Sequence, residues 1–324
     1  MTLDDVAKHA GVALDTARKA LRDDPTVRPY IKERVVNSAA KLDYHPNLVA
    51  RALKQQALRL VPISVIDLGN PYFGGLARDL SRCLCRHGLE PALCLEVDRL
   101  FRLCRSLSTC ASIVAYGYDA ATIRALGRIQ KVVTVNREFD LARTANVANV
   151  RIDFCAAYRE AIEAVLRTGR KRVAICSEWL ARWGATGISS GKFEVVVEVL
   201  REHGLEPVSY EGQPHFGTPA AVAARLEKSA GAIDAIFCDN DIQAGLVYGE
   251  AASRGLRVPD DLLIVGCDAT QVLHGMWSIK VETQVLAEQA VDVLKLLLDG
   301  AKHVEERVYR PTLVDHRGSL VGGG

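Results

Sequence analysis

Features that mark several large classes of protein are missing from this sequence of 324 residues. No apolar run reaches the length of a membrane-spanning helix, and Met1 leads into a helical pattern without a charged and then apolar leader. No strand-like segment is followed by the three-glycine dinucleotide fingerprint or the Walker phosphate loop, and the histidines form no paired metal motif. We therefore expect a cytoplasmic protein without a membrane partner, cofactor, metal site or catalytic site.

The cysteines form no paired framework. There are nine, an odd number, and only Cys83 and Cys85 lie close together, with no Cys-x-x-Cys pair. Four others fall in or beside strand-like segments, namely Cys155, Cys176, Cys238 and Cys267. Because thiols buried in strands are inert by default, we expect reduced core cysteines rather than disulfides or a thiol enzyme.

Charge is spread unevenly along a chain that is too long for a typical single domain. Residues 1–59 hold 11 Lys and Arg against 7 Asp and Glu, a net charge of +4. The remainder holds 30 against 32, a net charge of −2, so the total is +2. The pattern predicts a small N-terminal domain suited to phosphate contact, although a surplus of this size also fits a solvated surface.

The first 21 residues have the pattern of a helix-turn-helix. Small and apolar residues recur at helical spacing before and after Gly11, which suits a tight turn because it has no Cβ. Thr2 is the predicted N-cap of the first helix. A third amphipathic helix is predicted over residues 27–42, with Pro29 in its first turn.

Directly after the third helix come Tyr44-His45-Pro46-Asn47 and the run LVARALK, which ends at Lys54. This order resembles the DNA-binding headpiece and hinge of the lactose repressor family of bacterial transcription regulators, and the resemblance covers the whole chain. It implies an all-α helix-turn-helix headpiece over 1–45, a hinge helix and linker over 46–59, and an effector-binding and dimerisation core over 60–320.

The resemblance places the second helix in the major groove of DNA. Lys or Arg there prefers guanine, Asp15 can accept from cytosine, and Leu14 offers an apolar contact. Ala13 and Arg28 stand where the family usually has a capping residue, and such a loss costs about 0.5–2 kcal/mol. The residues expected to contact DNA are Leu14, Asp15, Thr16, Arg18, Lys19, Arg28, Asn47, Arg51, Leu53 and Lys54.

In the hinge, Leu53 matches the leucine that relatives wedge into the minor groove at the centre of the site. Arg51 and Lys54 flank it with charge suited to phosphates. The alternative is an amphipathic linker helix that packs on the core. An isolated helix this short is unstable in water, so its order should depend on DNA and on a partner subunit.

From residue 60 onward, apolar runs alternate with amphipathic helices, which predicts parallel sheets covered by helices. The runs include residues 60–67, 131–136, 206–211 and 262–268. The resemblance implies a two-lobed, periplasmic-binding-protein-like α/β core made of two doubly wound sheets. We expect lobe one over 60–153 plus 284–302, and lobe two over 154–283 plus 303–320.

Ligands of such folds bind outside the carboxyl ends of the strands, so polar and aromatic residues at these positions are candidates. Their paired donors and acceptors around aromatic faces suit a polyhydroxylated ligand, a sugar or a sugar derivative. Each residue has an alternative role as a helix cap or core residue. Lys192 stands where relatives carry Arg, replacing a bidentate fork with a point charge. The effector candidates are Tyr72, Phe73, Asn136, Arg137, Asp153, Lys192, Asn240, Asp241 and Asp268.

Together these features predict a homodimeric transcription regulator, a repressor, that binds a palindromic operator and responds to a small carbohydrate effector. Because binding energies are linked, an effector that prefers the DNA-incompetent state must weaken DNA binding. The alternative is a cytosolic sugar-binding protein whose headpiece no longer functions. No heptad repeat follows Leu320, which favours a dimer over a tetramer.

Overall fold

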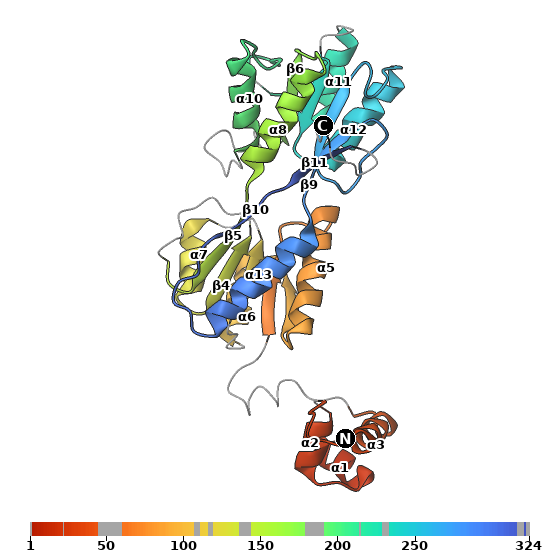
Figure 1. The fold of residues 1–324 in the computed structure, drawn as a ribbon, viewed down its shortest axis with the longest axis vertical. Coiled ribbons are helices and arrows are strands. Elements are labelled where there is room, and N and C mark those ends of the chain that lie inside the picture. Colours follow the sequence, from red (N-terminus) through yellow and green to blue (C-terminus); the bar gives the residue numbers. More distant parts are fainter. Residues whose placement is uncertain are drawn as a thin grey trace. The chain divides into compact units, whose positions relative to one another are not determined.

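The computed structural model describes residues 2–21, 23–44, 60–106, 111–115, 119–135, 144–178, 191–213, 215–228, 233–315 and 321. The chain divides into two compact units, Met1–Leu58 and Arg59–Gly324. The first is the headpiece and the second is the core (Figure 1). Each is described by itself.

The headpiece packs three helices around a small core: α1 (Leu3–Ala10), α2 (Leu14–Ala20) and α3 (Pro29–Lys41). Thr2 and Asp5 form a capping box at the start of α1, so both side chains satisfy backbone N–H groups that the helix leaves free. Gly11 ends α1 in the left-handed conformation, with φ +62°. The three predicted helices are confirmed, and α2 and α3 begin without a side-chain cap, as Ala13 and Arg28 predicted.

Lobe one contains a six-stranded, all-parallel sheet in the order β10-β5-β4-β3-β1-β2. Its strands are β1 (Leu60–Ser64), β2 (Glu90–Cys94), β3 (Ala111–Ala115), β4 (Lys131–Val135), β5 (Val147–Ile152) and β10 (Arg307–Tyr309). Its helices are α5 (Pro71–Arg86), α6 (Val97–Ser106), α7 (Ala120–Gly127) and α13 (Thr283–Leu298).

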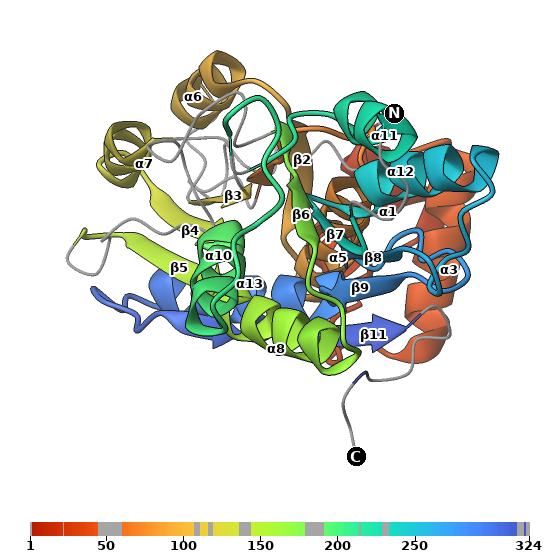
Figure 2. The ribbon, with the colours of Figure 1, turned by 90° about the horizontal axis from the view of Figure 1, so that it is seen from above.

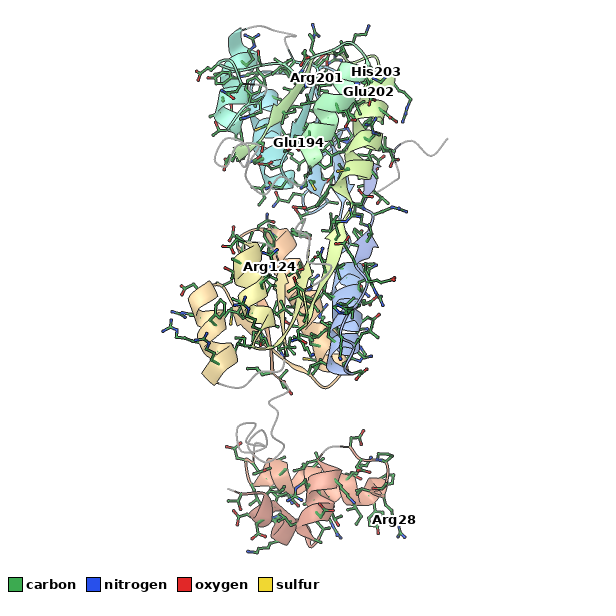
Figure 3. All side chains as sticks on the ribbon, turned by 90° about the vertical axis from the view of Figure 1, so that its left-hand side faces the viewer. Arg28, Arg124, Glu194, Arg201, Glu202 and His203 are labelled. Carbon is green, nitrogen blue, oxygen red and sulfur yellow. The ribbon has the colours of Figure 1, made fainter. Side chains whose placement is uncertain are left out.

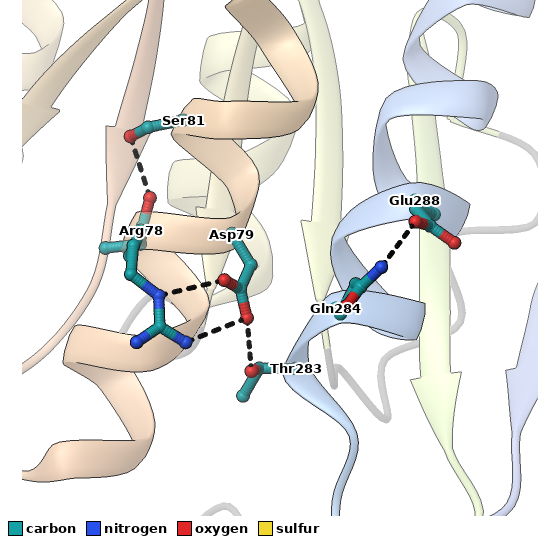
Figure 4. Close-up of polar contacts among 7 residues, drawn as sticks. Arg78, Asp79, Ser81, Thr283, Gln284 and Glu288 are labelled. Atoms are coloured by element: carbon teal, nitrogen blue, oxygen red, sulfur yellow. Dashed lines mark hydrogen bonds and ion pairs between the residues drawn. The ribbon is translucent and has the colours of Figure 1, made fainter. Parts of the chain in front are cut away.

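The two faces of this sheet bury alternate side chains. Ile113 and Val133 join the core beneath α5 and α13, whereas Val114 and Val132 pack with α6 and α7. Helices α5 and α13 lie side by side, although about 200 residues separate them in the sequence (Figure 1). Thr283 at the start of α13 donates a hydrogen bond of 2.6 Å from Oγ1 to Oδ2 of Asp79 on α5, and Arg78 flanks the same carboxylate (Figure 4).

Lobe two contains a five-stranded sheet in the order β11-β9-β8-β7-β6, in which only β11 is antiparallel. Helices α8 and α10 cover one face, and α11 and α12 cover the other (Figure 2). The strands are β6 (Val173–Cys176), β7 (Ala235–Cys238), β8 (Leu263–Asp268), β9 (Trp277–Lys280) and β11 (Thr312–Asp315). The helices are α8 (Phe154–Arg167), α10 (Lys192–Glu202), α11 (Pro219–Lys228) and α12 (Asp241–Ser253).

The predicted fold class is confirmed, with two corrections in detail. Residues 303–320 do not all belong to lobe two, because β10 pairs in parallel with β5 of lobe one before β11 joins lobe two. The chain therefore passes from lobe one to lobe two at residues 310–311, and not at residue 303 as predicted. The apolar run at 206–211 forms no extended strand; instead Phe216 bridges to Cys176 at the edge of β6.

Candidate functional sites

The outer face of α2 carries the polar residues expected to reach DNA bases. Ala17 and Ala20 are buried in the headpiece core, which turns Leu14, Asp15 and Lys19 outward. Leu14 is 40% exposed, so its side chain is accessible for an apolar contact. Thr16 and Arg18 are half-buried at the sides of the helix.

Asp15 forms ion pairs with both cationic side chains of α2, Arg18 and Lys19. Its carboxylate lies 2.9 Å from Nη1 of Arg18 and 3.5 Å from Nζ of Lys19. These are ion pairs on a solvated helix surface, so each contributes little to stability and can exchange readily for a contact with DNA. The same helix face therefore presents acidic and basic groups of the kinds that read base edges.

Outside α2, the predicted DNA contacts are less completely described. Arg28 is exposed at the start of α3 (Figure 3), where its side chain makes no capping hydrogen bond. Lys32 of α3 donates from Nζ to Oδ1 of Asp23, in the connection between α2 and α3, at 2.7 Å. Four predicted hinge contacts lie outside the described residues: Asn47, Arg51, Leu53 and Lys54.

In lobe one, the aromatic pair that follows β1 packs inward. Asn70 caps α5 by accepting from the N–H of Tyr72 at 2.9 Å. Tyr72 is only 3% exposed and meets Phe73 edge to face, with ring centroids 5.1 Å apart. An effector contact for this pair stays a prediction. Asn136 and Arg137 lie outside the described residues.

Asp153 lies where two connections between the lobes run side by side. It caps α8 by accepting from the N–H of Ala156 at 3.4 Å, and Oδ2 lies 3.8 Å from Nε of Arg310. Its own N–H donates to the carbonyl of Tyr309 at 2.8 Å. The structure thus gives Asp153 a capping role at the crossover, which is the alternative that the sequence left open.

Lobe two brings Lys192 and Asp268 to the carboxyl end of its sheet. Nζ of Lys192 lies 4.0 Å from the ring centroid of Phe154 and 3.6 Å from Sγ of Cys267, which in turn lies 3.4 Å from Oδ1 of Asp268. The aromatic face and the nearby carboxylate both stabilise the ammonium. An ammonium, a carboxyl and a thiol therefore meet next to one aromatic ring.

The titration of these groups reflects burial and mutual charge. Burial raises the pKa of Asp268 to about 6, although Lys192 opposes the shift, and Asp241 adds to it. For Lys192, burial opposes the charged form, but Cys267, Asp268 and Asp239 outweigh it and raise the pKa. A buried carboxyl with a raised pKa beside a cation at a strand end is typical of functional sites.

Asn240 and Asp241 follow β7, and both are engaged with the protein itself. Asn240 caps α12 by accepting from the N–H of Gln243 at 3.0 Å. Asp241 is fully buried, and its carboxylate accepts from the N–H of Thr270, the N–H of Gln271 and the hydroxyl of Ser278. The carboxylate of Asp241 is thus engaged within the protein, and its direct contact with an effector stays a prediction.

Three residues of this edge were not predicted from the sequence, namely Ser177, Asp239 and Ser278. Asp239, the first residue after β7, accepts from Oγ of Ser177 at 2.7 Å, and Ser278 lies on the crossover strand β9. The position of Asp239 directly after an apolar run was a usable signal. The role of Ser278 had no such signal, because it depends on how two strands align.

Comparison with known proteins supports this division of the chain. The description "Bacterial regulatory proteins, lacI family" matches residues 2–47, and "Periplasmic binding protein-like domain" matches residues 162–320. The chain is 29% identical over 273 residues to the ribose operon repressor of Bacillus subtilis, which covers 82% of this chain and 81% of that protein. It is 27% identical over 282 residues to catabolite control protein A of Priestia megaterium, covering 84% and 83%.

Among solved structures, the lac repressor dimer bound to operator and the anti-inducer ONPF matches with a TM-score of 0.75, at 19% identity and 99% coverage of both chains. The fold and the helix-turn-helix define the class: a helical DNA-binding headpiece joined to a two-lobed periplasmic-binding-protein-like core. Within that class, the chain combines a lacI-family helix-turn-helix domain with a periplasmic-binding-protein-like domain, and the relatives named above are transcription regulators. Among the residues that the structure describes, we find no helix with the length and apolar character that spanning a membrane requires.

Proposed function

We propose that this chain is a transcription repressor of the cytoplasm that binds a palindromic operator as a homodimer. The DNA-binding part of this proposal rests on the complete helix-turn-helix. This motif has a capping box, a left-handed Gly11 and a face of α2 that bears Asp15, Arg18 and Lys19.

The operator affinity is set by a sugar or sugar derivative held at the carboxyl ends of the strands. Lys192 and Asp268 supply a donor and an acceptor there, which suits the hydroxyl groups of a sugar. Relatives include ribose and sucrose operon repressors, and a similar solved structure is a regulator in complex with cellobiose.

The test is selection of bound sequences from a random DNA pool by the full chain, with recovered sites measured again at two salt concentrations. The proposal expects a palindrome and a steep fall of affinity as salt rises, because phosphate contacts release counterions. Lys19→Ala should lower operator affinity and relax the base preference. Lys8→Ala removes the same charge from α1, where Lys8 pairs with Asp4, and serves as the matched control.

Ribose, sucrose, cellobiose and lactose are then added to the operator complex, and sedimentation gives the subunit number. Recovery of no motif, with weak binding alone, would favour a sugar-binding protein with a non-functional headpiece. If a motif is recovered but no sugar changes the affinity for it, the protein is a DNA-binding regulator and the proposed sugar effector is refuted.

A further inference from the structure

The segment after β8 has a backbone that side chains rarely adopt. Asp268 and Ala269, two consecutive residues other than glycine, have φ angles of 92° and 52°. A Cβ in the left-handed region meets its own backbone, so such a conformation persists only where the surroundings hold it. The segment follows the strand end at which Lys192 and Asp268 meet.

Two side chains hold this segment, here called the 268–271 loop. Oδ2 of Asp241 accepts from the N–H of Thr270 at 2.6 Å and from the N–H of Gln271 at 3.2 Å. Oδ1 of Asp241 accepts from Oγ of Ser278 at 2.7 Å. Oγ of Ser278 in turn accepts from the N–H of Ala269 at 3.0 Å. Three consecutive backbone N–H groups are thus satisfied from one buried carboxylate and its hydroxyl partner.

The fold is shaped to admit this carboxylate. A Cβ on Gly266 of β8 would clash with Oδ1 of Asp241, so only glycine lets the carboxylate reach the loop. Burial raises the pKa of Asp241, and the hydrogen bonds from Ser278, Gln271 and Thr270 oppose that rise. A costly buried carboxylate is therefore stabilised by Ser278 of β9 and by the loop that it holds.

We propose that Asp241 is a positioning residue: without touching the effector, it holds the 268–271 loop so that Asp268 faces the ligand beside Lys192. This inference rests on the proposed sugar-controlled function. It also links the site to the crossover, because Ser278 belongs to β9, which leads to α13 of lobe one. A bound sugar that contacts Asp268 would then act on a segment already fastened to the connection between the lobes.

The test compares Asp241→Asn with Asp234→Asn in the full chain. Asp234 is the matched control: it lies at the opposite end of β7 in the same lobe, and its carboxylate also accepts two backbone N–H groups, those of Lys171 and Arg172. Asn keeps the size of Asp241 but turns an amide donor toward backbone donors. Hydrogen exchange resolved to residues 269–271 reports the loop, and calorimetry with ribose, sucrose, cellobiose and lactose reports sugar affinity.

We expect Asp241→Asn to speed exchange at Thr270 and Gln271 and to weaken sugar binding, each by about tenfold or more, because hydrogen bonds to a charged acceptor are lost. Asp234→Asn should change neither measurement at these residues. A second change, Ala269→Gly, removes the Cβ that opposes the left-handed backbone. Added to Asp241→Asn, it should restore part of the sugar affinity, which a purely structural loss of lobe two would not allow.

Equal loss of sugar affinity in the Asp241 and Asp234 variants would overturn the proposal, as would unchanged exchange at 269–271 in Asp241→Asn. A wild type that binds none of the four sugars would instead refute the sugar part of the proposed function. The exchange rates would then test only whether Asp241 holds the 268–271 loop. Faster exchange in Asp241→Asn would support that role, and unchanged exchange would overturn it.

Discussion

Replacing Asp268 by asparagine should stabilise lobe two at neutral pH. Burial raises the pKa of Asp268 from 3.8 to about 6. An acid whose pKa is higher in the folded protein favours the protonated form there, so its ionisation costs stability. That cost is absent below the unfolded pKa and is complete above the folded one.

The size of the effect follows from the shift. Two pKa units correspond to about 3 kcal/mol at pH 7, since each unit is worth about 1.4 kcal/mol. Roughly half of this cost is already present at pH 5, so it grows by about 1 kcal/mol between pH 5 and pH 7. Asparagine resembles the neutral carboxyl, so Asp268→Asn should be more stable than the wild type, with a difference that increases over this range.

Urea unfolding followed by circular dichroism in buffers from pH 5 to pH 8 measures this difference. Asp261 gives a control of opposite sign, because its hydrogen bonds with the side chain and backbone of Arg257 lower its pKa to about 2. Its contribution is present above the unfolded pKa and is lost as pH falls toward 2, so Asp261→Asn should destabilise the protein at neutral pH. A variant at Asp268 that is less stable at pH 7, or a difference independent of pH, would refute the reasoning.

Three further predictions concern the helix-turn-helix, the hinge and the glycine beneath Asp241. Ala13→Ser should add the missing cap of α2, stabilise the headpiece by about 1 kcal/mol and slow hydrogen exchange of the α2 amides; unchanged exchange would contradict it. Leu53→Ala should lower operator affinity roughly tenfold or more while sugar affinity of the free protein stays the same, and equal operator affinity in a binding assay would remove the wedge. Gly266→Ala should destabilise lobe two by about 1–3 kcal/mol in chemical unfolding, because its Cβ displaces the Asp241 carboxylate; wild-type stability would show that the carboxylate can move freely.

The headpiece and the two sheets could be predicted because their signals are local. The spacing of Val6, Ala7 and Ala10 before Gly11, and of Ala17 and Ala20 after it, predicts two short helices whatever lies beyond them. Parallel strands buried on both faces leave continuous apolar runs, as in the strand Val173–Cys176. Periodicity of this kind needs no knowledge of distant partners.

The path of the last crossover could not be predicted in the same way. Strands β10 and β11 lie only a few residues apart, and their apolar content does not say which sheet each one joins. That choice follows from pairing with Val150–Ile152 in lobe one and with Trp277–Lys280 in lobe two. Pairing across such sequence distances is decided by packing of the whole core, as is the irregular course of residues 206–211.

The same limit explains why the sequence placed Asp241 at the ligand. Asn240, Asp241 and Asp268 all follow strands of one sheet, so their positions alone make them equivalent candidates. Their contacts differ: Asn240 caps α12, the carboxylate of Asp241 lies against Gly266, and Asp268 has a left-handed backbone and lies beside Cys267. In this cluster we therefore propose that Asp268 meets the ligand and that Asp241, whose carboxylate is hydrogen-bonded within the protein, positions it.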